Sequence, residues 1–140
     1  MNPDFEVFRS EIIALHEKEI EAHLNKDIEF FVQDIADDYI AVSYGEIRKP
    51  TIEEIRSQFT SYPNNTVFTK YEDLCEPIIR FSKDGSLAWA ILQVAVKGRR
   101  TRDDRSVKNL DFTCAWITIY ERQDDKWIRV TDGSSFKNEF

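Results

Sequence analysis

Apolar and polar positions follow a helical period near the start of the chain. Between residues 4 and 24 the apolar side chains recur at spacings of three to five, and charged side chains fall elsewhere on the helical wheel. The apolar set is Phe5, Phe8, Ile12, Leu15, Ile20 and Leu24. This pattern predicts a helix over residues 4–24. Asn25 and Lys26 interrupt it, and Asp27 is placed to cap a short second helix over residues 28–35.

Two further local signals precede the middle of the chain. Residues 39–44 have a β-rich composition and are followed by Gly45, so they predict a first strand that ends in a turn. Pro50 and Thr51 then begin a third helix. Thr51 is its N-cap and Glu54 occupies the third helical position, which is the capping-box arrangement. We expect this helix to end within residues 62–65.

Long β segments replace the helical pattern after residue 65. Turn signals separate four stretches rich in β-branched and aromatic residues, at 66–81, 87–98, 110–122 and 127–136. This arrangement predicts consecutive hairpins of an antiparallel meander. A chain of 140 residues without repeats or linkers has the usual size of one domain. We therefore expect a single α+β domain over residues 1–140, with three N-terminal helices packed on a curved, mostly antiparallel sheet.

Both faces of the late strands are apolar. In the segment 87–96 one face carries Leu, Trp and Ile while the other carries Ala, Leu and Val, and the segment 110–122 repeats this pattern. A sheet that is buried on both sides needs two coverings. Three helices can cover one face only. We therefore expect a second copy of the chain to cover the other face, in a homodimer formed through the sheet.

Charge and composition exclude some partners. The formal net charge is −7 and the acidic residues are spread along the chain, which argues against a nucleic-acid partner. The one basic cluster, within residues 97–105, is interrupted by Asp103 and Asp104 and is expected to be a solvated hairpin tip. No apolar run reaches the length of a membrane span and no secretory leader is visible, so we expect no membrane partner and a cytoplasmic location. Cys75 and Cys114 lack metal-type spacing and are interpreted as buried apolar fillers.

Several local strings follow one another in a characteristic order. They are Asn25-Lys26-Asp27, Ile35-Ala36-Asp37-Asp38-Tyr39, Gly45 followed by Thr51-Ile52-Glu53-Glu54, and Asp124-Asp125-Lys126-Trp127-Ile128-Arg129-Val130 with Ser134 and Ser135 behind it. In order and spacing they resemble the nuclear transport factor 2-like superfamily, especially its SnoaL-like and ketosteroid-isomerase-like branch, over nearly the whole chain. The resemblance implies a cone-shaped, cystatin-like fold, a pocket at the wide end of the cone, and dimerisation through the sheet.

The same resemblance implies a wide range of functions. The superfamily includes isomerases, dehydratases, cyclases, epoxide hydrolases and binding domains without chemistry, so the residues must decide among them. When positions are counted without gaps, the helix-one tyrosine of the steroid isomerases falls on Glu19 and their general-base carboxylate falls on Ser43. Their second oxyanion donor falls near Trp116 or Thr118. The steroid-isomerase mechanism, which needs a base and acidic donors, is therefore not supported.

The first helix carries the candidate catalytic residues. His16 and His23 are seven residues apart and lie nearly above one another in the apolar stripe, with Glu19 between them. Burial raises the pKa of a carboxyl and imidazole titrates near neutrality, so these residues can act as acid/base groups or contact a ligand. Two other interpretations stay open, a metal site and a set of core residues with satisfied hydrogen bonds. We assign neither a metal nor a cofactor.

The strands supply further candidates for ligand contact. Aromatic and polar side chains at plausible inward positions are Tyr39, Tyr44, Trp89, Gln93, Trp116, Thr118 and Arg129. Core packing is the alternative for the aromatic ones. The register of the last strand decides whether Arg129 or Asp132 points inward. An inward guanidinium would need Glu19, Asp111 or a ligand carboxylate as its partner.

Two hypotheses of function follow. The first is an enzyme that performs acid/base chemistry, such as isomerisation, dehydration or ring closure, on a small and mostly apolar molecule. The second is a non-catalytic ligand-binding or dimerisation domain. It is favoured by the missing base at Ser43 and by the absence of a paired Asp-Arg-Asp or Tyr-Asp-His pattern. A cavity with a histidine hydrogen-bonded to Glu19 would favour the enzyme, and a cavity filled by Phe and Trp rings would exclude it.

Overall fold

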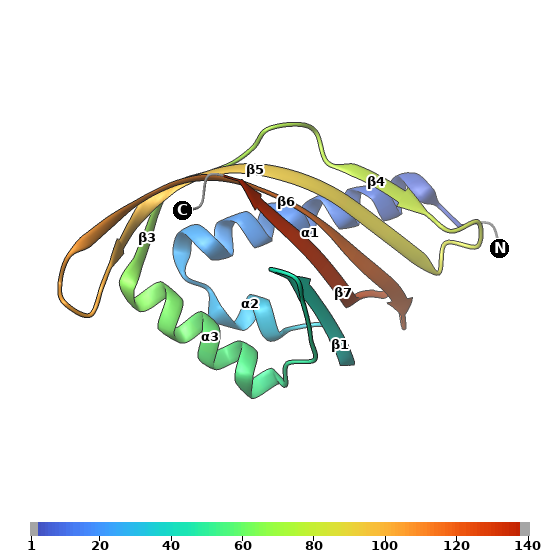
Figure 1. Ribbon diagram of the computed structural model, residues 1–140. Coiled ribbons are helices and arrows are strands. Elements are labelled where there is room, and N and C mark those ends of the chain that lie inside the picture. The colour runs from blue at the N-terminus through green and yellow to red at the C-terminus, as the bar shows by residue number, and fades with distance from the viewer. Residues whose placement is uncertain (1–2, 138–140) are drawn as a thin grey trace.

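Three helices lie against the concave face of one strongly curved sheet (Figure 1). The computed structural model describes residues 3–137, with residues 61–64 described by their backbone alone. The helices are α1 (Phe5–Asn25), α2 (Ile28–Val32) and α3 (Ile52–Asn65). The strands are β1 (Ile35–Ser43), β2 (Glu46–Arg48), β3 (Thr66–Asp73), β4 (Ile78–Phe81), β5 (Leu87–Thr101), β6 (Val107–Gln123) and β7 (Lys126–Lys137). The α+β architecture predicted from the sequence is confirmed.

Side-chain caps fix where the helices begin. The Asp4 carboxylate accepts a hydrogen bond from the Val7 backbone N–H at the start of α1, and Asp27 accepts one from Phe30 at the start of α2. The capping box predicted at Thr51 is present, because Thr51 and Glu54 each accept a hydrogen bond from the other's backbone N–H. The second helix is shorter than predicted and ends at Val32, so Ile35 belongs to β1 instead.

The sheet combines an antiparallel meander with one parallel pair. The strand order is β2-β1-β7-β6-β5-β3, and β4 also pairs with β5. The predicted hairpins β5–β6 and β6–β7 are present, whereas the pairing of β1 with β7 is parallel. The predicted segment 66–81 is two strands rather than one. Both pair with β5, and the break between them contains Pro77, which has no N–H to give to a strand ladder.

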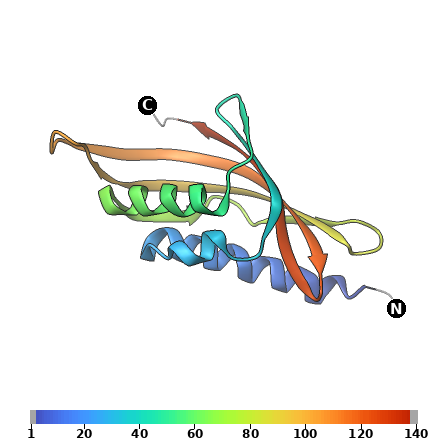
Figure 2. The same ribbon diagram turned by 90° about the horizontal axis from the view of Figure 1, so that it is seen from below.

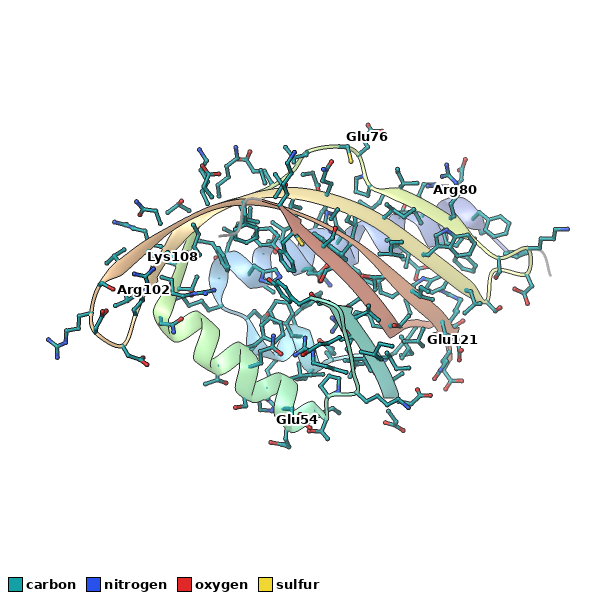
Figure 3. The ribbon with its side chains drawn as sticks, in the orientation of Figure 1. Glu54, Glu76, Arg80, Arg102, Lys108 and Glu121 are labelled. Carbon is teal, nitrogen blue, oxygen red and sulfur yellow. The ribbon has the colours of Figure 1, made fainter. Side chains whose placement is uncertain are left out.

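The two faces of the sheet differ in how they are covered. Ala88, Leu92 and Val94 of β5 face the helices and are buried, whereas Ile91 and Ile117 lie on the outer face and are partly exposed. Figure 2 shows the three helices side by side across one face, with the β5–β6 hairpin extending beyond them. In Figure 3, Glu76 and Arg80 point away on the outer side of the sheet. Apolar residues therefore lie on both faces of β5 and β6, as predicted, and those of the outer face are open to solvent.

Aromatic rings close the end of the domain where α1 begins. We call Phe5, Phe8, Phe81 and Trp127 the narrow-end cluster, in which neighbouring ring centroids lie 5.3 to 6.4 Å apart. The β4–β5 turn packs closely against this cluster and against Pro3. A Cβ added to Gly85 would lie 3.0 Å from Phe8 Cε2 and 2.8 Å from the Pro3 Cβ. Gly85 also has φ +74°, so a side chain there would be strained for a second reason. This end of the domain is tightly packed.

One cysteine differs from the prediction. Cys114 is buried, as expected, but Cys75 is exposed. Cys75 lies in the connection between β3 and β4, and its neighbours Leu74 and Glu76 are also exposed. The connection runs over the surface and not through the core, so an apolar residue type there is left in solvent.

Candidate small-molecule cavity

A cavity of about 360 Å³ lies between the concave face of the sheet and the helices. Its volume is at the small end of the range for ligand pockets, about 300 to 1,000 Å³. The apolar part of its wall is formed by Phe31, Ile35, Ala41, Ile55, Phe59, Phe112, Trp116 and Phe136. The polar part is formed by Glu19, His23, Tyr39, Ser43, Arg48, Gln58, Arg100, Arg129, Asp132 and Ser134. Ring side chains line this cavity but do not fill it.

A β-bulge in β7 turns two charged residues toward this cavity. In the ladder with β6, Tyr120 pairs with Arg129 and Ile119 pairs with Thr131, so Val130 is left as the extra residue. Side chains of a regular strand alternate between faces, and Arg129 and Asp132 would then lie on opposite faces. The extra residue shifts the alternation by one. Both Arg129 and Asp132 therefore face inward, and the sequence-based choice between them was wrong because it assumed a regular strand.

Asp132 is held by Tyr39. The Tyr39 hydroxyl donates a hydrogen bond to Asp132 Oδ2, and Tyr39 is buried at 7% exposure. Burial raises the pKa of Asp132, while the bond from Tyr39 and the charges of Arg129 and Arg48 oppose that change. Burial and the Asp132 carboxylate together raise the pKa of Tyr39. The pair thus combines a carboxylate that is costly to ionise with a hydroxyl that keeps its proton.

Glu19 is the second carboxyl in the wall. It comes from the middle of α1, and burial raises its pKa despite the opposing charges of Arg129 and His16. Its surroundings differ from those of Asp132, which has a hydroxyl donor. Two carboxyl groups from α1 and β7 therefore share one cavity in different environments.

Arg129 connects these groups to the short helix α2. Its Nη2 donates hydrogen bonds to the backbone oxygens of Phe31 at 3.0 Å and Phe30 at 3.2 Å, at the end of α2. The guanidinium also lies over the Phe30 ring, 5.5 Å from its centroid. A cation at a helix C-terminus is favourable because the last carbonyls lack helical partners. The partner of the inward guanidinium is thus backbone carbonyl oxygen.

His23 lies against aromatic rings at the cavity wall. Its ring stacks on Tyr71 with centroids 4.5 Å apart, and the Phe31 centroid lies at 4.8 Å. Burial lowers the pKa of His23 to about 4, so the imidazole is neutral at neutral pH. Within the described residues its Nδ1 is buried without a hydrogen-bond partner. The structure therefore places a neutral ring in this part of the wall.

His16 points elsewhere. Its Nε2 lies 2.7 Å from Asp73 Oδ1 at the end of β3, and the residue is 2% exposed. It is not part of the cavity wall. Within the described part of the chain its Nδ1 is buried and makes no hydrogen bond. The helical stripe predicted from the sequence thus divides, with Glu19 and His23 at the cavity and His16 between α1 and β3.

The predicted strand residues also divide. Tyr39, Tyr44, Trp116 and Arg129 line the cavity, and Tyr44 lies at its open side with 61% exposure. Trp89 and Gln93 do not line it, because they alternate with the buried Ala88, Ala90 and Leu92 and so lie on the outer face of β5. Thr118 is on the inner face but is covered at 2% exposure and does not reach the wall. Alternation along β5 defines two sets of residues but not which set faces the helices. The predicted inward positions of Trp89 and Gln93 were wrong for this reason.

Arg48 and Gln58 of the wall had no sequence signal, and Ser43 and Ser134 were named only through the family resemblance. Arg48 was not considered because β2 has three residues, all exposed, and lacks an alternating pattern. Ser43 and Ser134 come from β1 and β7, and their hydroxyl oxygens lie 3.0 Å apart. The parallel pairing of these strands creates that contact, with Val42 opposite Gly133.

The polar groups of the wall include proton donors and acceptors. Within residues 3–137 no group of three or more His, Cys, Asp or Glu side chains is placed to hold a metal ion. None of the described helices has the length and apolar character that crossing a membrane requires. Glu19, Arg129, Asp132 and Tyr39 together form a carboxyl, guanidinium, carboxyl and hydroxyl set that the linear sequence did not show. Such a set can donate and accept protons beside a bound molecule.

Comparisons by sequence and by structure give different results. No family model matches this sequence, and no curated protein matches it. Solved structures do match. An NTF2-like protein from Cytophaga hutchinsonii is 19% identical with a TM-score of 0.71, and the match covers 91% of this chain and 96% of that protein.

Two more solved structures support the same fold. A putative calcium/calmodulin-dependent kinase II association domain from Exiguobacterium sibiricum is 11% identical, with a TM-score of 0.72 over 99% of this chain and 98% of that one. A protein of unknown function with a cystatin-like fold from Nostoc punctiforme is 14% identical, with a TM-score of 0.66 over 94% and 92%. The chain therefore has the nuclear transport factor 2-like, cystatin-like fold predicted from its sequence.

Proposed function

We propose that this chain is an acid/base enzyme that binds a small, mostly apolar molecule in the cavity and moves a proton on it. The observation that carries the proposal is the pair of carboxyl groups, Glu19 and Asp132, facing one largely apolar cavity of about 360 Å³. Burial raises the pKa of both groups, which brings carboxyl chemistry closer to neutral pH. The proposal agrees with the SnoaL-like and ketosteroid-isomerase-like branch in the kind of reaction, but Asp132 takes the place of the base that is missing at Ser43.

The two carboxyl groups have different roles in this proposal. Asp132 accepts a hydrogen bond from Tyr39, which favours its ionised form, so Asp132 is the base. Glu19 is the acid, which donates a hydrogen bond to an oxygen atom of the substrate. Proton removal beside a carbonyl needs both functions, and it is a step shared by isomerisation, dehydration and some ring closures. Arg129 contributes positive charge beside both carboxyl groups.

Hydrogen exchange at carbon tests this assignment without knowledge of the product. Small cyclic and aryl ketones are incubated with the protein in D₂O, and deuterium uptake beside the carbonyl is followed by NMR. We expect Asp132→Asn and Glu19→Gln each to slow the protein-dependent uptake about a hundredfold. Matched controls are Asp111→Asn on β6 and Glu17→Gln on α1, both exposed positions, which should exchange like the wild type.

Two outcomes would contradict this proposal, the first its enzyme activity and the second its assignment of the carboxyl groups. If no ketone exchanges faster than in buffer although some bind, the cavity is a non-catalytic binding site. If exchange persists in both Glu19→Gln and Asp132→Asn, the chemistry does not lie at these carboxyl groups. Binding is measured separately through the tryptophan fluorescence of Trp89→Phe/Trp127→Phe protein, in which Trp116, the tryptophan that lines the cavity, is the one that remains.

We also propose that two copies pair through the outer face of the sheet. Ile78 on β4, Ile91 on β5 and Ile117 on β6 lie opposite one another in the ladders and are 41%, 37% and 44% exposed. A row of exposed isoleucines across three strands favours a covered interface. Ile117→Lys should therefore convert a dimer to a monomer in sedimentation velocity, whereas Ile47→Lys at the sheet edge should not. A wild-type protein that sediments as a monomer at tens of micromolar would contradict this pairing.

A further inference from the structure

The open side of the cavity carries arginine side chains, although the chain as a whole has a net charge of −7. Exposure distinguishes the open side from the deep side of the wall. Tyr44, Arg48 and Gln58 are exposed, whereas Phe31, Tyr39 and Trp116 are buried at 5%, 7% and 9%. Arg100 also lines the cavity and is partly exposed. Positive charge is therefore placed where a ligand would enter.

The sheet register aims Arg48 across the opening. Arg48 lies opposite Ala41 in the β1–β2 ladder, and Ala41 lies opposite Asp132 in the β1–β7 ladder. Residues opposite one another in a sheet share a face, and neighbouring strands are about 4.8 Å apart. The small Ala41 side chain leaves the space between the other two open. Arg48 is close enough to Asp132 for its charge to oppose the rise in the pKa of that carboxyl.

The hairpin that carries Arg48 is fixed in place. Its turn residues Tyr44 and Gly45 both have positive φ, 53° and 75°, which suits a tight two-residue turn. The Tyr44 ring stacks on Phe136 of β7, with centroids 4.9 Å apart and planes 6° from parallel. This contact holds the hairpin over the end of β7. Arg48 is therefore presented to the opening by a supported strand, although β2 is a sheet edge.

Arg100 is positioned from the other side of the cavity. It lies on β5, and its Nε donates a hydrogen bond to Thr66 Oγ1 at 3.3 Å, where α3 meets β3. The preceding residue, Arg99, is exposed and does not line the cavity, since neighbouring strand residues alternate between faces. These two adjacent arginines thus lie on opposite faces of the sheet, and only Arg100 lines the cavity.

We propose that the ligand of this cavity is an amphipathic carboxylate, whose apolar body enters the cavity and whose charged group stays at the opening with Arg48 and Arg100. This inference deepens the proposed function and rests on the same cavity. Guanidinium groups bind carboxylates through charge-assisted hydrogen bonds in a planar, two-point geometry. Deeper in the cavity Glu19 and Asp132 would repel the carboxylate, which favours a position of the charged group at the opening.

Matched pairs of acid and amide test the charge requirement. Decanoate is compared with decanamide, and naphthalene-2-carboxylate with its amide, by titration calorimetry of the full chain at pH 7.5 and low salt. We expect each acid to bind at least about tenfold more tightly than its amide, with the difference reduced at high salt. Arg48→Gln should weaken acid binding about fivefold to tenfold and change amide binding less than twofold.

Arg100→Gln provides the second arm of the test, and Arg99→Gln is its matched control. The first should weaken acid binding and the second should leave both ligands unchanged, while Arg48→Lys should recover part of the affinity lost in Arg48→Gln. Circular dichroism checks that each variant is folded.

Three results would overturn the proposal. Equal affinity for acid and amide would remove the charge requirement and leave an apolar cavity. Equal losses of acid affinity in Arg99→Gln and Arg100→Gln would show that the effect comes from the net charge of the chain and not from a contact at the opening. Absence of binding of either acid and of either amide would contradict this inference and also the proposed use of the cavity as a ligand-binding site. Acid binding without ketone exchange would overturn the enzyme function alone.

Discussion

The two ends of the domain place an arginine against aromatic rings in different ways. At the narrow-end cluster, the Arg122 guanidinium lies 4.2 Å from the Phe8 ring centroid and 5.1 Å from that of Trp127, and Nη1 is 3.4 Å from Glu11 Oε1. At the wide end, Arg129 lies over Phe30 and bonds to backbone oxygen. The first arginine completes a packed cluster. The second lies in the wall of a cavity.

The carboxyl groups show the same contrast. Glu11 at the narrow end is partly exposed and forms an ion pair with Arg122. Glu19, two turns further along α1, lies at the cavity, where burial raises its pKa. Both glutamates belong to one helix, so helix formation does not explain the difference. The difference between the two glutamates comes from their surroundings. Glu11 pairs with Arg122 beside a packed cluster, whereas Glu19 borders an unfilled space. Buried ionisable groups of this kind are candidates for functional residues.

The largest expected effect would break the comparison if it failed to appear. Trp127→Ala removes a residue that is 4% exposed from the narrow-end cluster and should lower the free energy of unfolding by about 3–5 kcal/mol. Phe59→Ala, in the cavity wall, should cost less because its ring already borders empty space. Urea denaturation measures both. Equal losses would show that the wide end is packed as tightly as the narrow end.

His23 gives an effect of intermediate size that depends on pH. Its pKa is about 4 in the folded chain and 6.5 without burial, so the unfolded chain takes up a proton first as the pH falls. Stability should therefore decrease between about pH 6.5 and pH 4, by up to about 3 kcal/mol. The His23→Phe variant should lose this part of the acid sensitivity.

Urea denaturation from pH 4 to pH 8 checks this prediction, with the wild type and His23→Phe compared at each pH. Glu19 should act in the opposite direction, because its raised pKa removes stability as the pH rises above the ordinary carboxyl range. Glu19→Gln should therefore flatten the neutral side of the profile. Parallel profiles for the wild type and His23→Phe would show that His23 is not desolvated.

The smallest effect sharpens the comparison by loosening one end only. Thr51→Ala removes the N-cap of α3, whose residues Ile55, Gln58 and Phe59 belong to the cavity wall, and should cost about 1 kcal/mol. Amide hydrogen exchange should become faster in α3 and stay unchanged in the first turns of α1. Faster exchange at the start of α1 would show that the two ends unfold as one unit.

Local rules predicted the parts of this fold that depend on neighbours in sequence. The α1 periodicity, the Asp27 cap and the Thr51 capping box are all present, because each is decided within a few residues. The apolar faces of β5 and β6 followed from period-two alternation. The resemblance that these elements supported is matched by solved structures of the same fold.

Contacts between distant strands were outside the reach of the same rules. The parallel pairing of β1 with β7 joins segments about ninety residues apart, and no local pattern records it. It brings Tyr39 to Asp132 and Ser43 to Ser134. The inward positions of Trp89 and Gln93 were wrong because alternation gives two sets of residues without showing which set meets the helices. These parts of the candidate site therefore depend on strand register and on which face meets the helices.

The extra residue in β7 sets which side chains of the strand face the interior. Before Val130 these are Trp127 and Arg129, and after it they are Asp132, Ser134 and Phe136. A regular strand that kept Val130 would present Thr131, Gly133 and Ser135 instead, and the cavity would exchange its acid for neutral groups. The bulge therefore decides that this part of the wall carries a carboxyl group. In any protein of this fold whose last strand lacks the extra residue, gap-free transfer of site residues would misplace every one beyond the bulge.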